Sequence, residues 1–297
     1  MPRYSSATIG ILCMTASMVW FSAMNIGVRW LSFEWHTTEI VLVRSLLGVF
    51  LLMPWVLKNG SEVLKTSRLK SHFWRSTIGV VGMQTWFYAI SIMSLNQATA
   101  LSLSAPIFTA AFAILFLGEK AGIHRWGAIL CGFMGALVII RPGSEVFDTN
   151  SLIVLGAASL WAWAGILVKS LTKTESPTLI IFYIGLFMSM WSFPLALPHL
   201  HVPTLTEFAV CIWIAIASFG AHWSLVNAYK HADIVILTPF DFSRLIFTAI
   251  LAYFFFAEIP TIHSWIGGAI IVASAAYIAH RERVKKTKPK LTEAPEL

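Results

Sequence analysis

Long apolar runs alternate with short polar stretches along almost the whole chain. Each run is about 20 residues long, which is the length that an α-helix needs to cross the hydrocarbon core of a bilayer. Turns as short as 94–97 and 231–233 join some runs and make consecutive helices antiparallel neighbours. The pattern predicts an all-α protein with ten membrane-spanning helices, near residues 8–32, 37–57, 73–95, 97–118, 124–140, 151–171, 178–198, 207–229, 232–257 and 262–280.

The composition supports the same class of protein. Of the 297 residues, 57% are hydrophobic and only 12% are charged. In soluble domains the charged fraction is usually about 25%. The formal net charge of +7 does not indicate nucleic-acid binding, because the Lys and Arg residues lie in loops and in the tail rather than along one helix face. We therefore expect an integral membrane protein whose surroundings are a lipid bilayer.

The positive charges of the loops predict an orientation. With a cytoplasmic N-terminus, only Arg29 and Arg141 fall on the outer side, and the other loop and terminal cations, Arg75 among them, fall inside. This bias follows the positive-inside rule and requires an even number of helices. We expect both termini to be cytoplasmic, in a bacterial inner membrane, and residues 281–297 to form a basic, disordered cytoplasmic tail that anchors the topology or touches anionic lipid.

The two halves of the sequence resemble each other. The stretch 118–126 (GEKAGIHRW) matches 257–265 (AEIPTIHSW) in its Glu, His and Trp, at an offset of 139 residues, and Pro54 matches Pro194. A copy with five helices has an odd number of crossings, so the second copy is upside down. Inverted repeats of this kind are common in secondary transporters. The sequence predicts two inverted five-helix repeats, 1–142 and 143–280.

Short motifs in both halves carry a resemblance to a known family. They are VRSLL at 43–47, LNQATALS at 95–102 leading to Pro106, FLGEK at 116–120, GAH at 220–222, PFDFSR at 239–244 and FAE at 256–258. In this order and spacing, the chain from about residue 8 to 280 resembles the drug/metabolite transporter superfamily, in particular proteins made of two EamA domains. The resemblance implies ten helices and transport without ATP, and the family includes exporters of amino acids and metabolites as well as uptake systems for S-adenosylmethionine.

Charged residues inside apolar runs are the strongest candidates for a substrate site, because burying a charge in lipid is costly. Arg44 lies about seven residues into the second run, where it either pairs with a substrate carboxylate or clamps helices together. Asp241 and Arg244 share a helix face just after Pro239, which can open the helix. They form either a binding and proton site or a self-neutralising pair. Asp241 is the better protonation candidate, because Arg stays charged.

Uncharged side chains in the middle of the runs complete the candidate substrate site. His222 either couples to protons or packs as a neutral ring. The remaining candidates either contact substrate or only join helices; they are Gln84, Asn227, Trp20, Trp86 and Trp163. Because Trp161 and Trp163 point in different directions on one helix, we expect only one of them to face a central cavity.

A further set of residues is predicted to have gating or structural roles. Glu119 and Glu258 end equivalent helices of the two repeats, and Pro106 and Pro239 interrupt helices near the expected site. The three cysteines lie in apolar runs without the spacing of metal ligands. No metal or cofactor is therefore predicted.

These features predict a secondary active transporter that works by alternating access. Its substrate is expected to be a small organic solute, with a zwitterionic amino acid or amino-acid derivative as the first candidate and efflux of cationic drugs or quaternary amines as the second. A proton or a counter-substrate is the expected coupling partner, and no oligomer is required. An integral membrane enzyme is disfavoured, because the buried polar residues are scattered rather than clustered near one interface.

Overall fold

The computed structural model describes residues 6–105, 107–108, 111–112, 123–140, 150–232, 237, 240–241 and 243–287. Within these ranges the chain is helical and contains no strand. The α-helices are α1 (Ser6–Leu31), α2 (Thr37–Asn59), α3 (Leu69–Ile92), α4 (Leu95–Ser102), α6 (Ile123–Ile140), α7 (Ser151–Leu171), α8 (Pro177–Ala196), α9 (Leu205–His231), α11 (Ser243–Phe256) and α12 (Ile262–Thr287), with 3-10 turns at Ser61–Leu64 and Leu197–His199.

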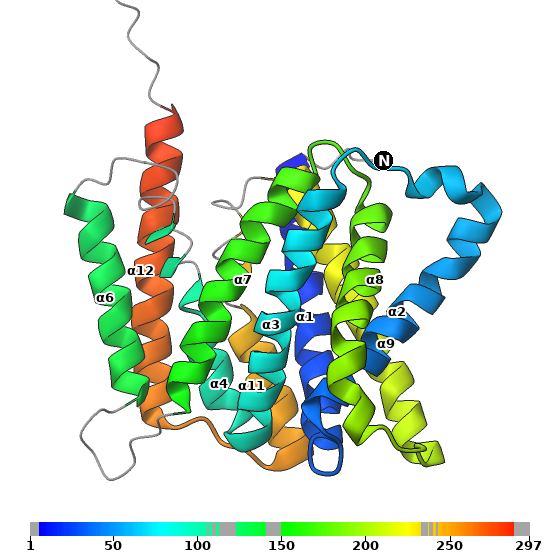
Figure 1. The fold of residues 1–297 in the computed structure, drawn as a ribbon. Helices are drawn as coiled ribbons and strands as arrows, with labels where there is room; N and C mark the ends of the chain where they lie inside the picture. Colours follow the sequence, from blue (N-terminus) through cyan, green and yellow to red (C-terminus); the bar gives the residue numbers. More distant parts are fainter. Residues whose placement is uncertain are drawn as a thin grey trace, which may run out of the picture.

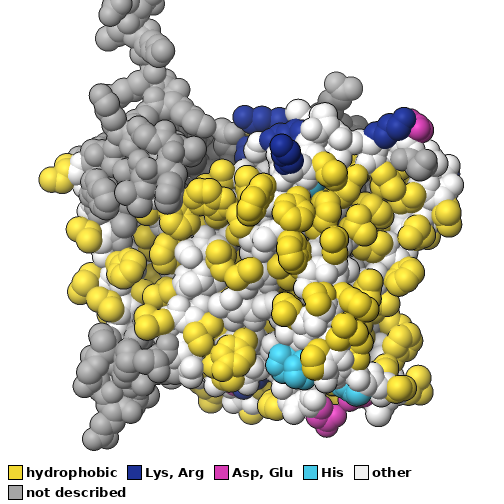
Figure 2. Space-filling model, viewed as in Figure 1, with side chains coloured by type: hydrophobic (Ala, Val, Ile, Leu, Met, Phe, Trp, Pro, Cys, Tyr) yellow, Lys and Arg dark blue, Asp and Glu magenta, His cyan; other side chains and the backbone are white. Residues whose placement is uncertain are grey.

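Each of the ten predicted segments overlaps one of these helices. Of the helices described, α1, α2, α7, α9 and the continuous helical stretch Pro177–His199 are long and apolar enough to cross a membrane. In Figure 2, hydrophobic side chains cover the middle of the visible face, and most of its Lys and Arg side chains lie at the upper edge. A surface with so broad an apolar band is that of an integral membrane protein.

Residues at the helix starts explain several boundaries. Ser94 accepts a hydrogen bond from the Gln97 amide at the start of α4, and Ser176 caps α8 ahead of its first-turn proline. Thr204 and Glu207 form a reciprocal capping box at the start of α9. Each cap satisfies backbone donors that a helix start leaves unpaired.

Two predicted boundaries were wrong. The third helix begins at Leu69 rather than residue 73, so that Arg75, which was counted with the cations of the inside loops, lies in the second turn of α3. The last helix continues to Thr287, and residues 281–287 are therefore helical rather than disordered. They are mostly Arg, Glu, Lys and Val, which continue a helix without a breaker. Residues 288–297 lie outside the described ranges.

The packing follows the predicted repeat. Helix α1 packs on α9, and the equivalent helix of the second half, α7, packs on α3. Helices that correspond to each other also pair, α2 with α8 and α6 with α12. Gly135 and Gly267 allow α6 and α12 to cross closely, because a Cβ at either position would lie within 2.8 Å of the other's carbonyl oxygen.

One pair of polar contacts recurs in both halves at an offset of about 140 residues. Arg29 at the end of α1 donates to the Ile90 carbonyl near the end of α3. Lys169 at the end of α7 donates to the carbonyls of Tyr229 and Ala232 at the end of α9. In Figure 1 the α1–α2 and α7–α8 connections lie at opposite ends of the bundle, as inverted halves require.

Both ends of the chain described here lie at one end of the bundle, where α1 begins and α12 ends (Figure 1). This agrees with an even number of crossings. Which side of the membrane this end faces remains a prediction.

Candidate functional site

A cluster of aromatic and polar side chains lies where α1, α3, α4, α7 and α11 meet. Trp86 of α3 donates from Nε1 to the Asn25 side-chain oxygen at 3.1 Å, and its ring centroid lies 5.0 Å from that of Trp161 on α7. The Arg244 guanidinium lies 5.7 Å from the centre of the Trp161 ring and donates to the Ser102 hydroxyl at 3.1 Å. We call these five residues the tryptophan cluster; they join both halves of the chain.

Small residues allow the helices to approach at this cluster. A Cβ at Gly82 would lie 3.2 Å from the Trp161 ring, so that glycine lets α3 and α7 pack closely. The Ser22 and Thr248 hydroxyls are hydrogen-bonded at 3.0 Å and tie α1 to α11. The aromatic faces are thus held by neighbours on several helices, as a preorganised binding surface requires.

A second buried cluster surrounds Ser218 of α9. Arg44 of α2 donates to the Ser218 hydroxyl and lies within 4.0 Å of the Met24 and Met188 sulfurs. The Ser218 carbonyl accepts a hydrogen bond from Nδ1 of His222 at 2.9 Å. This contact places a proton on Nδ1. We call Arg44, Ser218 and His222 the Ser218 cluster; Arg44 is held there by neutral groups.

Asp241 and Arg244 do not form the expected pair. Among the described residues no ion pair joins them, and Arg244 instead contacts Ser102 and Trp161. Asp241 and Arg244 do lie within electrostatic range of the Tyr229 hydroxyl. Sharing a helix face makes an ion pair possible, but neighbours from α4 and α7 decide where a long Arg side chain goes.

The other predicted substrate residues are dispersed. Trp20 packs on Gly220, Trp163 packs on Phe112, and Asn227 donates to the Trp223 carbonyl of its own helix. Gln84 is two residues from Trp86 and therefore on the opposite face of α3, where both polar atoms of its amide are buried without a hydrogen-bond partner among the described residues.

Of the residues predicted to gate or support the halves, Glu258 has a clear structural contact. Its carboxylate accepts hydrogen bonds from the amides of Leu95 at 2.9 Å and Asn96 at 3.4 Å, at the start of α4. A carboxylate there also favours the helix dipole. Glu119, Pro106 and Pro239 lie outside the described residues.

Sequence reasoning missed two residues that lie among the functional candidates. Trp161, rather than Trp163, contacts Trp86 and Arg244. The weak signal that could have selected Trp161 is Gly82 on α3, where the absence of a side chain lets a ring approach. Arg75 was counted as a loop cation, yet it is 7% exposed. Arg75 lies only two residues after the start of the predicted run 73–95, a position at which a cation is usually exposed, so nothing in the sequence indicated its burial.

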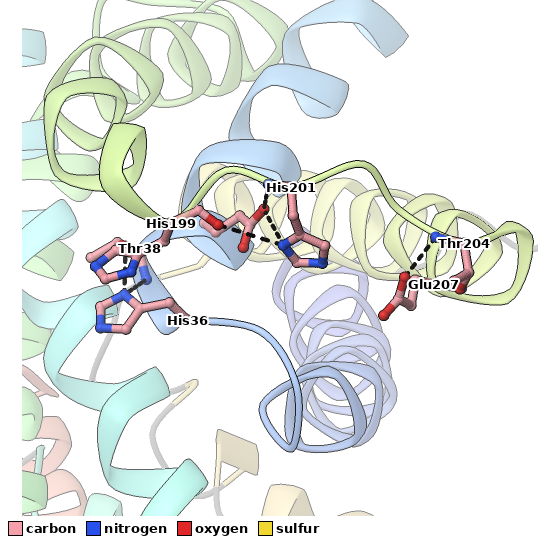
Figure 3. Close-up of polar contacts among 7 residues, drawn as sticks. His36, Thr38, His199, His201, Thr204 and Glu207 are labelled. Carbon is pink, nitrogen blue, oxygen red and sulfur yellow. Dashed lines mark hydrogen bonds and ion pairs between the residues drawn. The ribbon is translucent and has the colours of Figure 1, made fainter.

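Four polar side chains form a cluster between the α1–α2 and α8–α9 connections. The rings of His36 and His199 stack with centroids 3.8 Å apart (Figure 3). Nδ1 of His201 lies 3.1 Å from the buried Glu39 carboxylate. We call these residues the histidine cluster. Partial burial, and to a lesser degree the neighbouring His199, lower the pKa of His36, while Glu39 opposes the shift. In the part of the chain that the structure describes, no group of three or more His, Cys, Asp or Glu side chains could hold a metal.

Comparisons with known proteins agree on one family. A model of the EamA-like transporter family matches residues 8–141 and again 150–279. A riboflavin transporter of Vibrio cholerae is 30% identical over 284 residues, which cover 94% of this chain and 95% of that protein. An S-adenosylmethionine uptake transporter of Rickettsia bellii is 30% identical over 281 residues, or 95% and 97% of the two chains. Both relatives are transporters rather than enzymes.

A solved crystal structure has the same fold. It aligns with a TM-score of 0.66 at 15% sequence identity and covers 94% of this chain and 99% of that one. At this level of identity the likeness concerns the fold alone.

Proposed function

The chain belongs to the EamA-like transporter family, and from this premise we propose that it moves a planar heteroaromatic metabolite with a polar side chain across the bacterial inner membrane. The observation that carries the proposal is the tryptophan cluster. Trp86 from the first half and Trp161 from the second half lie 5.0 Å apart between helices of opposite repeats. Aromatic faces at a repeat interface favour a flat solute.

The named substrates of the two relatives support this choice of class. Riboflavin and S-adenosylmethionine both join a planar nitrogen heterocycle to a flexible polar chain. Most amino acids have no such ring, and the relatives give a simple amino acid no support. Of the amino-acid class, only a member or derivative that carries a heteroaromatic group fits the proposal.

Efflux of a cationic drug or quaternary amine is a weaker proposal. Arg44 of the Ser218 cluster and Arg244 of the tryptophan cluster are both buried. Neither forms an ion pair with a carboxylate in the described part of the chain. Arg244 already occupies the cation position over Trp161. A solute that carries only positive charge, with no acidic group to offset it, would be repelled by these guanidinium groups.

The mechanism that we propose is alternating access of the two inverted halves, with both termini in the cytoplasm and no oligomer required. Asp241 and His222 are the proposed proton-coupling groups, and exchange of a counter-substrate is the other mode. His222 has Nδ1 committed to the Ser218 carbonyl, which leaves Nε2 as its proton-accepting atom.

Uptake into proteoliposomes tests the substrate class. We expect labelled riboflavin or S-adenosylmethionine to enter at a rate at least about tenfold above labelled leucine or tetraethylammonium, which is a difference of about 1.4 kcal/mol in transition-state free energy. Trp86→Ala should abolish the difference. Trp265→Ala is the matched control, because Trp265 is 46% exposed on α12. Equal rates for all four solutes in the unsubstituted protein would refute the proposed class.

A further inference from the structure

The Arg75 side chain points into the helix bundle, although the residue lies close to the start of its helix. It lies in the second turn of α3, which begins at Leu69, and is only 7% exposed. One of its terminal nitrogens lies 2.9 Å from the position that a Cβ would take at Gly79. Gly79 is one turn farther from the helix start, so the guanidinium extends along α3 toward the middle of the membrane.

This direction is opposite to the usual one. Helical side chains lean toward the N-terminal end of their helix, and long cations near a membrane surface extend toward the water. Both tendencies would take Arg75 to the nearby start of α3. A glycine at position 79 leaves the space that the inward conformation requires.

Arg75 has no carboxylate partner in the part of the chain that the structure describes. It makes no hydrogen bond or ion pair within the described residues, and the Nε atoms of both Arg75 and Arg44 are buried without an acceptor. The polar contacts of Arg44 with described residues are to a hydroxyl and two sulfurs. The two guanidinium groups also repel each other, and both lie within electrostatic range of His222. Unpaired buried charges of like sign are strongly destabilising, so a compensating anion is the missing element.

We propose that Arg75 and Arg44 form an anion subsite that binds a carboxylate or phosphate group of the transported solute, beside the tryptophan cluster. This inference rests on the proposed function and narrows its substrate to an anionic or zwitterionic heteroaromatic compound. Arg75, Gly79, Gly82 and Trp86 have the spacing of one helix face. The guanidinium lies near the level of Gly79, about 10 Å along the axis from Trp86. An acidic group attached to the ring by a flexible chain spans that distance.

Matched probe pairs test the subsite and identify its anion. S-adenosylmethionine and its decarboxylated form differ by a carboxylate, and flavin mononucleotide and riboflavin differ by a phosphate. Binding of each to the purified full chain is measured by quenching of tryptophan fluorescence. We expect the acidic member of at least one pair to bind about tenfold more tightly, equivalent to one guanidinium–anion contact of about 1.4 kcal/mol. A carboxylate preference and a phosphate preference both support the subsite and assign its ligand.

Two variants assign the preference to Arg75. Arg75→Gln removes the charge, and Gly79→Ala retains it but displaces the guanidinium, because the added Cβ would lie 2.9 Å from its nitrogen. Each should reduce the preference to less than about twofold without weakening the neutral probe. Lys65→Gln, which removes a charge from an exposed side chain, should leave the preference intact. Gly79→Ala keeps the test available if Arg75→Gln does not fold.

The outcomes separate the subsite from the proposed function. Equal binding of acidic and neutral probes by the unsubstituted protein, or a preference that persists in both Arg75→Gln and Gly79→Ala, overturns the subsite and leaves the heteroaromatic proposal standing. Absence of binding by all four probes overturns the proposed function itself.

Discussion

The hydrogen bond between Trp86 and Asn25 should make a measurable contribution to stability. Its donor and acceptor are 3.1 Å apart, and the two residues are 1% and 2% exposed. Trp86→Phe leaves the Asn25 oxygen unpaired, and Asn25→Leu leaves the indole N–H unpaired. Each orphaned buried group should cost about 1–3 kcal/mol, and Trp86→Phe should lose further packing because the ring is smaller.

The double variant separates the bond from these other losses. Once one partner is gone, replacing the second removes an unsatisfied group and adds little cost. We therefore expect Asn25→Leu with Trp86→Phe to be less destabilised than the sum of the single variants. Coupling energies for such bonds between membrane helices average about 0.6 kcal/mol and reach about 1.7 kcal/mol.

Reversible unfolding in mixed micelles with increasing SDS, followed by far-ultraviolet circular dichroism, measures the four free energies of the cycle. The same cycle with Asn25→Leu and Trp265→Phe is the control, because these residues lie on α1 and the exposed face of α12. Costs that add to within about 0.3 kcal/mol for the Trp86 cycle would refute the claim that this bond fixes the ring.

Three further predictions follow from individual contacts. Glu258→Gln weakens the cap of α4 and should lower stability by about 0.5–2 kcal/mol in the same unfolding assay, and an unchanged value would exclude a capping role. Gly267→Val pushes α12 from α6 and should destabilise by about 1–3 kcal/mol, whereas stability within error of the parent would contradict the close crossing. His36 docks best on His199 while it is neutral, because its pKa is lowered. Lowering the pH from about 7.5 to about 5.5 should therefore reduce the protection factors of the amides in residues 197–201, after correction for the intrinsic exchange rate at each pH, and the reduction should vanish in His36→Asn. Protection factors that stay the same at both pH values in the parent protein would contradict that reasoning.

Much of the architecture could be predicted from sequence, because it depends on local pattern. Hydrophobic runs of spanning length locate all ten described helices, and the repeated Glu, His and Trp reveal the two halves. The repeat is visible in contacts that no motif specifies, such as Arg29 with the Ile90 carbonyl and Lys169 with the Tyr229 carbonyl.

The candidate site was predicted less completely, because the direction of a long side chain depends on distant neighbours. Helical spacing placed Asp241 and Arg244 on one face, but Ser102 and Trp161, from other helices, take the guanidinium. Arg75 was counted with the loop cations, but it lies in the second turn of α3, where Gly79 leaves space for its guanidinium.

Counterflow in proteoliposomes tests the central claim most directly. Vesicles that contain the purified protein are loaded with unlabelled riboflavin or S-adenosylmethionine and diluted into a trace of the labelled solute, without ATP or an ion gradient. A transporter whose halves expose one site alternately should produce a transient accumulation of label above its equilibrium level, and Trp86→Ala should remove it. Entry of label to equilibrium without any overshoot, for every loaded solute, would contradict the account.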